Sequence, residues 1–187
     1  LCGEEAGQLL VDEEDIDAIA LAGSTTTAVK VMRRLAQVPM LRPVIAALGS
    51  KNPAFVTASA DLDLAADGIV RSAFASQGQS CLALSIVYAE RAVYAGLLER
   101  LKGRVLAIKT GSPEEARVTM GPVISAAALS RFEAAVRAVR ARGRIVTGGD
   151  RLQTGRLARG FFAAPTIAAD LPLDHPLLRD ELLLPLL

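Results

Sequence analysis

Short apolar runs alternate with stretches of mixed polarity along the whole chain. Short apolar runs favour buried strands, whereas apolar positions that recur with the helical period favour helices. The pattern predicts strands over residues 16–22, 43–48, 54–58, 84–89, 145–146, 161–168 and 183–187. It predicts helices over residues 25–37, 61–76, 92–105 and 125–142. Strands that alternate with helices predict an α/β fold, with a mostly parallel sheet and flanking helices.

Polar and glycine residues mark where these elements begin and end. Asp61 is placed to cap the helix that follows it, since aspartate is favoured at this position. Gly78 interrupts the same helix near its end, and Gly143 closes the helix over residues 125–142. The segment 149–159 is more polar than its surroundings and is predicted to be a loop or a hairpin.

Composition narrows the classes of function. The chain has 187 residues, of which 51% are hydrophobic and 22% charged, so it can bury a core. Its formal net charge of +1 gives no broad electrostatic attraction to nucleic acid or anionic membranes. Cys2 and Cys81 are too few for a disulfide framework, which favours a reducing cytoplasm. His175, alone with two distant cysteines, gives no zinc-binding spacing. The apolar run at 182–187 suggests that the sequence is a piece of a longer protein.

Three short segments carry candidate chemistry. Gly23-Ser24 stands where a strand turns into a helix, so it is either an anion-binding turn or an ordinary N-cap. Cys81 follows Gly78 on the turn before the strand at 84–89, where a thiol is either a nucleophile or a buried, inert side chain. The segment from Pro43 to Pro53 is predicted to be a strand and its turn. Lys51 in this turn is either an ordinary solvated side chain or part of a functional site.

Together these segments resemble the NAD(P)-dependent aldehyde dehydrogenase superfamily. Their order matches: the Gly-Ser turn, then Leu48-Gly49-Ser50-Lys51-Asn52-Pro53, then Gly78-Gln79-Ser80-Cys81. Met120 to Ile124, Gly160 to Phe162 with Pro165-Thr166, and Asp180-Glu181-Leu182 also stand where this family has landmarks. Within the superfamily, residues 42–45 and 52–63 are most similar to bacterial 1-pyrroline-5-carboxylate (glutamate semialdehyde) dehydrogenases, which act in proline catabolism.

The resemblance implies an oxidoreductase that converts a small aldehyde to an acid with NAD or NADP in the cytoplasm. Cys81 matches the nucleophile that forms a thioester intermediate. Gly23 and Ser24 match the residues at the cofactor pyrophosphate, Leu48 the residue whose carbonyl lies near the nicotinamide, and Glu181 the carboxylate that holds a ribose. It further implies that residues 1–48 are the edge of the cofactor domain and residues 49–187 an incomplete catalytic domain. A homo-oligomer is possible by family, and no metal is expected.

One departure from the family pattern concerns the second half of the reaction. Ala47 stands where the family usually has a glutamate that activates water to hydrolyse the thioester, and alanine has no group for that role. This leaves two alternatives to a hydrolytic dehydrogenase. The protein is either a variant that passes its acyl group to coenzyme A or a degenerate, non-catalytic copy. The chain by itself is expected to be inactive.

Overall fold

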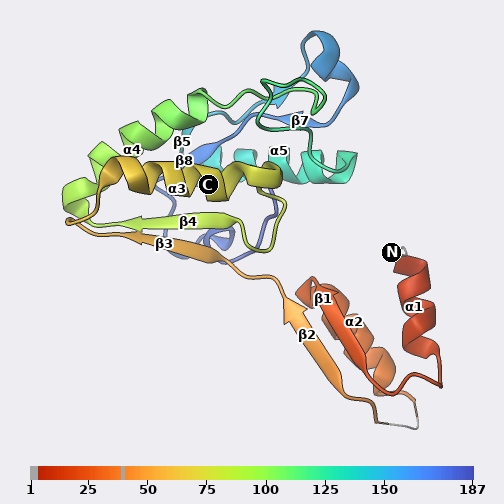
Figure 1. The fold of residues 1–187 in the computed structure, drawn as a ribbon. Coiled ribbons are helices and arrows are strands. Elements are labelled where there is room, and N and C mark those ends of the chain that lie inside the picture. Colours follow the sequence, from red (N-terminus) through yellow and green to blue (C-terminus); the bar gives the residue numbers. More distant parts are fainter. Residues whose placement is uncertain (1–3, 39–40) are drawn as a thin grey trace. The chain divides into compact units, whose positions relative to one another are not determined.

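The structure, a computed structural model, describes residues 4–38 and 41–187. The chain divides into two compact units, Leu1–Ser50 and Lys51–Leu187 (Figure 1). The described residues of the smaller unit form one pair of parallel strands and two helices. Its elements in order are α1 (Glu4–Asp12), β1 (Ile19–Gly23), α2 (Thr25–Leu35) and β2 (Val44–Leu48).

The parallel pair of the smaller unit sets the position of its polar turn. In the register of β1 and β2, Ala22 lies opposite Ala47 and Gly23 lies opposite Leu48. Ser24 directly follows β1 and caps α2, with its Oγ accepting a hydrogen bond from the Thr27 N–H at 3.1 Å. The carboxyl ends of both strands and the N-terminus of α2 therefore meet at one edge.

The larger unit contains most of the secondary structure. Its strands are β3 (Asn52–Val56), β4 (Leu84–Ala89), β5 (Arg144–Thr147), β6 (Arg151–Leu152), β7 (Phe162–Ala163) and β8 (Ile167–Ala169). Its α-helices are α3 (Leu62–Phe74), α4 (Arg91–Leu106) and α5 (Ala126–Arg142). Three 3₁₀ turns, η1 (Ala75–Gly78), η2 (Gly155–Arg159) and η3 (Pro176–Leu178), complete it.

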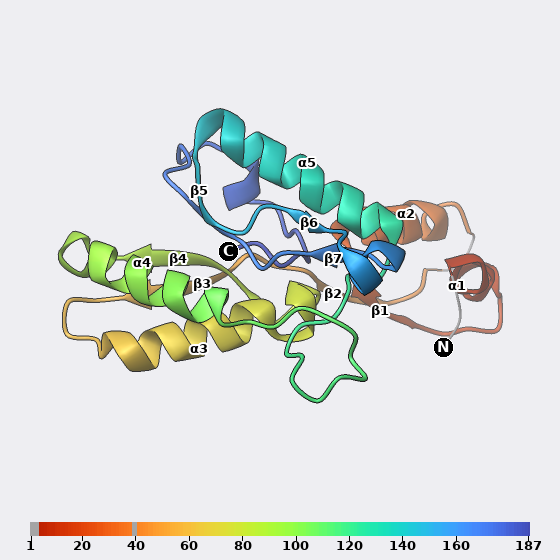
Figure 2. The ribbon, with the colours of Figure 1, turned by 90° about the horizontal axis from the view of Figure 1, so that it is seen from above.

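Strand pairing in this unit is both parallel and antiparallel. β3 pairs with β4 in parallel, whereas β5 pairs with β8 and β6 with β7 in antiparallel. Helices α3 and α4 lie side by side and pack on the β3–β4 pair (Figure 1). Helix α5 lies along the antiparallel strands (Figure 2).

Two hydrophobic clusters hold the larger unit together. The first lies between α3, α4 and the β3–β4 pair and contains the buried side chains Ile69, Phe74, Leu97, Leu101 and Met120. The second lies under α5, where Leu129, Phe132 and Val136 pack on Ala163 and Leu184. Among the described residues, no helix has both the length and the apolar character that crossing a membrane requires.

The α/β class predicted from the sequence is confirmed, and local signals located several elements closely. The strand predicted over 84–89 is β4. Asp61 caps α3, with its Oδ1 accepting from the N–H groups of Asp63 and Leu64 at 2.9 and 3.1 Å. The predicted hairpin over 149–159 corresponds to β6, which pairs with β7 beyond η2.

Other predicted elements were wrong or displaced. The strand predicted over 161–168 is two short strands, β7 and β8, which belong to different pairs. The run 183–187 is not a continuous strand, since Leu183 has a φ of 53°. Its last three residues lie in parallel beside residues 166–168, joined by a bridge between Leu186 and Thr166 and by three backbone hydrogen bonds. The helix predicted over 61–76 ends at Phe74, because Ala75 leaves the helical backbone with a ψ of 141° and Ser76 follows in a left-handed conformation.

Two further differences concern strand limits and one helix. β1 begins at Ile19 rather than at residue 16, and β3 runs from Asn52 to Val56 rather than over 54–58. Helix α1 was not predicted.

Candidate active site

Cys81 is an exposed free thiol at the junction between η1 and β4. The helix-to-strand position that the sequence predicted is therefore confirmed, and the cysteine is exposed rather than buried. Cys2 lies outside the described residues. A thiol on an exposed turn is accessible to a small electrophile, which a nucleophilic role requires.

Hydrogen bonds fix both peptide planes that flank Cys81. The Ser80 carbonyl accepts from the Ala83 N–H at 3.0 Å, and the Leu82 N–H donates to Ser80 Oγ at 3.2 Å. Within the described part of the chain, the Cys81 N–H itself has no acceptor. A rigid N–H next to the thiol is placed to stabilise an oxyanion that forms when the thiolate adds to a carbonyl.

The chain reaches this turn through three successive left-handed residues. Ser76, Gln77 and Gly78 have φ angles of 50°, 58° and 66°. Gly78 is buried, and a Cβ atom at this position would lie 2.3 Å from the Leu184 carbonyl oxygen. Only glycine meets both demands, so Gly78 fixes the path by which the chain leaves α3 and enters the cysteine turn.

The segment 120–124 supports the turn from a second side. The Gln79 Oε1 accepts from the Ile124 N–H at 3.0 Å. With its amide in the orientation that satisfies both neighbours, Gln77 accepts from the Gly121 N–H at 3.0 Å and donates to the Ser76 carbonyl at 3.2 Å. This family landmark therefore lies in direct contact with the segment that carries Cys81.

Asn52 holds the turn from a third side, and sequence reasoning gave it no role. Its side-chain Nδ2 donates to the carbonyls of Cys81 at 2.7 Å and of Ala83 at 2.9 Å. Because Asn52 and Cys81 are 29 residues apart, no local pattern links them. The one available signal was that both belong to the segments that carry the family resemblance.

In the smaller unit, the structure brings three predicted cofactor residues together. Gly23 and Leu48 are paired at the carboxyl ends of β1 and β2, and Ser24 follows at the N-terminus of α2. Ligands of open α/β sheets bind outside the carboxyl ends of the strands, and helix N-termini attract phosphate groups. Ser24 does serve as an N-cap, as the alternative interpretation held, and a capping hydroxyl leaves the other first-turn N–H groups available. Ala47 is exposed beside Leu48.

Glu181 and Lys51 belong to the larger unit. Glu181 is half-buried, and among the described residues its Oε1 is a buried oxygen without a hydrogen-bond partner. Burial lowers the pKa of Lys51, while the carboxylates of Asp180 and Glu181 oppose that shift. A buried carboxylate oxygen without a donor is suited to accept a hydrogen bond from a ligand hydroxyl.

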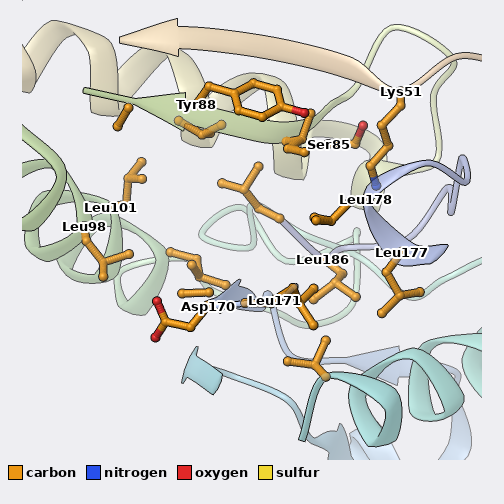
Figure 3. Close-up of a pocket in the computed structure, with 18 of the residues that line it drawn as sticks. Lys51, Ser85, Tyr88, Leu98, Leu101, Asp170, Leu171, Leu177, Leu178 and Leu186 are labelled. Atoms are coloured by element: carbon orange, nitrogen blue, oxygen red, sulfur yellow. The ribbon is translucent and has the colours of Figure 1, made fainter. Parts of the chain in front are cut away.

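A cavity of about 420 Å³ lies between the β3–β4 pair and the C-terminal segment (Figure 3). Its lining is largely apolar, with Leu101, Leu171 and Leu186 among the side chains. Figure 3 shows Lys51 extending from the start of β3 toward the segment that carries Leu177 and Leu178. Cys81 is not part of this lining.

His175 has a structural role in the larger unit. It is buried, and its Nδ1 accepts from the Leu177 N–H at 3.2 Å as the N-cap of η3. Among the described side chains, no group of three or more His, Cys, Asp or Glu residues is arranged to hold a metal ion.

Comparison with known proteins places this geometry in a family. The sequence profile described as "Aldehyde dehydrogenase family" matches residues 1–187. The chain belongs to the aldehyde dehydrogenase family. It is 36% identical over 184 residues to the 1-pyrroline-5-carboxylate dehydrogenase of Anoxybacillus flavithermus, covering 96% of this chain and 35% of that protein. The resemblance stated from the sequence is thus confirmed, and this chain spans about a third of the length of its relative.

Solved structures give the same result for the fold. A 1-pyrroline-5-carboxylate dehydrogenase from Thermus, with bound NAD, matches with a TM-score of 0.89 and 31% identity, over 100% of this chain and 36% of that one. An NAD-dependent aldehyde dehydrogenase from Sinorhizobium meliloti matches with a TM-score of 0.91 and 32% identity, over 99% of this chain and 36% of that one. The fold is that of the family over this part of its length.

Proposed function

We propose that the protein oxidises a small aldehyde to a carboxylic acid with NAD or NADP, through a thioester on Cys81 as its nucleophile. One observation carries the proposal: in a chain that matches the family from end to end, the exposed Cys81 stands on a turn with both flanking peptide planes fixed. The similarity to 1-pyrroline-5-carboxylate dehydrogenases favours glutamate semialdehyde as the aldehyde and proline catabolism as its setting.

The chemistry proposed for Cys81 begins with its thiolate. The thiolate sulfur adds to the aldehyde carbon, and the carbonyl electron pair moves onto the oxygen, where the Cys81 N–H donates to it. A bound nicotinamide would supply the acceptor for the hydride that leaves that carbon as the oxyanion collapses. Cys81 is then left as a thioester.

Four residues are proposed to hold the cofactor. Gly23, Ser24 and Leu48 stand at the edge formed by two strand ends and a helix N-terminus, which suits a pyrophosphate and the ring beyond it. Glu181 offers its buried, unpartnered Oε1 to a ribose hydroxyl. Taken separately, the strand ends with the helix N-terminus suit a phosphate and the Glu181 carboxylate suits a ribose hydroxyl, which supports NAD or NADP use.

The division of the chain into two compact units supports an assignment of different roles to its two parts. We propose that residues 1–48 are the edge of the cofactor-binding domain and that residues 49–187 belong to the catalytic domain; the compact units divide between Ser50 and Lys51. A cytoplasmic location suits the free Cys81 thiol, which reducing conditions preserve. A homo-oligomer is proposed from the family.

Ala47 favours a second candidate for the deacylation step. A methyl group cannot take a proton from water, so the acyl group would leave more readily to a strong nucleophile such as the thiol of coenzyme A. In that reaction the coenzyme A sulfur attacks the thioester carbon, Cys81 departs as thiolate, and an acyl-CoA forms. A non-catalytic copy is the remaining alternative.

A partition experiment separates these candidates. The chain, joined to the flanking segments of the Anoxybacillus relative, is given aldehyde and NAD, with or without coenzyme A. A hydrolytic dehydrogenase yields acid at a rate that coenzyme A leaves unchanged. A large rate increase with acyl-CoA as product assigns the protein to the acyl-transfer class. No NADH under either condition contradicts the proposed function.

A further inference from the structure

Asn52 occupies a position in β3 where the backbone cannot complete the strand ladder. Pro53 follows it and has no N–H to donate. The pairing with β4 also shifts at this point, since Asn52 lies opposite Leu84 but Pro53 lies opposite Ile86. At this irregular point of the ladder, the Asn52 side chain donates to two carbonyls at the entrance of β4, those of Cys81 and Ala83.

The side-chain amide of Asn52 meets two acceptors at once. Its Nδ2 lies 2.7 Å from the Cys81 carbonyl oxygen and 2.9 Å from the Ala83 carbonyl oxygen. Two carbonyl partners require the NH₂ group rather than the amide oxygen, so the orientation of the side chain is fixed by its neighbours. Both hydrogens of one amide are directed at the turn that carries the thiol.

The bond to the Cys81 carbonyl acts on the peptide plane that follows Cys81, and the bond to the Ala83 carbonyl acts on the plane that enters β4. A peptide unit is planar, so holding the Cys81 carbonyl also fixes the Leu82 N–H, which donates to Ser80 Oγ. The plane before Cys81 is fixed separately by the bond between the Ala83 N–H and the Ser80 carbonyl. Without Asn52, the plane after Cys81 would keep only the 3.2 Å bond to Ser80 Oγ.

We propose that Asn52 is a positioning residue for the nucleophile: its amide holds the cysteine turn so that the thiolate and the Cys81 N–H act on the same carbonyl group. This inference rests on the proposed role of Cys81. Asn52 touches neither the substrate nor the reacting atoms, and it works through the backbone of Cys81.

The test compares two reactions of the same thiol in the full 187-residue chain, with Cys2→Ser so that Cys81 is the one cysteine. With p-nitrophenyl acetate, the thiolate adds to the ester carbon, an oxyanion forms, and p-nitrophenolate leaves with its electron pair. With iodoacetamide, the thiolate displaces iodide and no oxyanion forms. Positioning of the N–H should matter to the first reaction and little to the second.

Asn52→Ala removes both hydrogen bonds, and Asn52→Leu removes them while keeping side-chain volume. In both variants we expect acylation to slow about tenfold or more, since a displacement of about 1 Å costs up to about 10²-fold in such reactions. Alkylation should change less than about twofold. Asn52→Gln keeps a donating amide on a longer arm and should restore part of the acylation rate.

Glu90→Ala is the matched control. The Glu90 carboxylate accepts from the Ala58 N–H at 2.6 Å and so joins the segments after β3 and β4 at the far end of the same strand pair. Its loss should lower the melting temperature without changing the ratio of the two rates. Equal slowing of acylation and alkylation in the Asn52 variants, or no slowing, would overturn the role of Asn52 alone. The acylation of Cys81 needs no cofactor, so the inactivity expected of the isolated chain in aldehyde oxidation does not extend to this reaction. A wild-type Cys81 that p-nitrophenyl acetate fails to acylate would overturn the nucleophile assignment as well.

Discussion

The backbone of Gly78 lies against the backbone carbonyl of Leu184, near enough that a Cβ atom would be 2.3 Å from its oxygen. Gly78 is the last of the three left-handed residues that lead into the cysteine turn, and Leu184 belongs to the C-terminal segment of the same unit. This contact ties the position of Cys81 to residues far along the chain. Side-chain reasoning does not detect such a contact, because it joins two backbones.

The contact predicts the effect of Gly78→Ala. The substitution places a Cβ in a left-handed conformation and against a backbone atom that cannot rotate away, so we expect a loss of about 2–4 kcal/mol in the free energy of unfolding. Urea denaturation measures it. Gly68→Ala is the control: Gly68 lies within α3 with open space around its Cα, so that change should be neutral or stabilise by up to about 1 kcal/mol. Similar effects at both sites would contradict the argument.

The sequence located elements whose signals are local. The cap at Asp61, the strand Leu84–Ala89 and the helix capped by Ser125 follow from short patterns of polar and apolar residues. It failed at 161–168 and 183–187, where an apolar run is buried without forming a continuous strand. Apolar character reports burial, whereas pairing depends on partners elsewhere in the chain.

In the candidate site, too, the features with local signals were predicted from the sequence, and the long-range contacts were not. The cysteine turn was located from its glycine and its position between helix and strand. The pairing of Gly23 with Leu48 follows from the parallel strands that the sequence predicted. The role of Asn52 was missed because its bonds to the cysteine turn cross 29 and 31 residues.

A second prediction concerns the pH dependence of stability through Lys51. Burial lowers its pKa below the usual 10.5 despite Asp180 and Glu181. Between the lowered pKa and 10.5, the unfolded chain binds more protons at this site than the folded chain, so stability at this site rises with pH. Below the lowered pKa, Lys51 is charged in the folded chain, and the whole free-energy cost of burying that charge lowers the stability of the folded state.

Lys51→Met should therefore stabilise the protein most at neutral pH. The difference in melting temperature between the variant and wild type should shrink as the pH rises toward 10.5. Lys109→Met is the control, at an exposed lysine in another loop. A stabilisation that stays constant with pH would indicate that the added methionine acts by packing alone.

A third prediction concerns Ala47. A general base is typically worth about 10²–10⁴-fold in rate, so Ala47→Glu in the protein completed with its relative's flanking segments should raise steady-state turnover. The first burst of NADH, which precedes deacylation, should change little. Ala46→Glu is the control, since neighbouring residues of a strand point to opposite faces. Unchanged turnover in Ala47→Glu would mean that the missing carboxylate at position 47 does not limit the rate of thioester hydrolysis.

The central claim is that Cys81 forms a covalent acyl intermediate. The completed protein is mixed with aldehyde and NAD, quenched in acid during the burst, digested, and analysed by mass spectrometry. We predict an acyl adduct on the peptide that contains Cys81, dependent on NAD and lost together with NADH formation in Cys81→Ala. An adduct on another residue, or NADH production that persists in Cys81→Ala, would contradict the account.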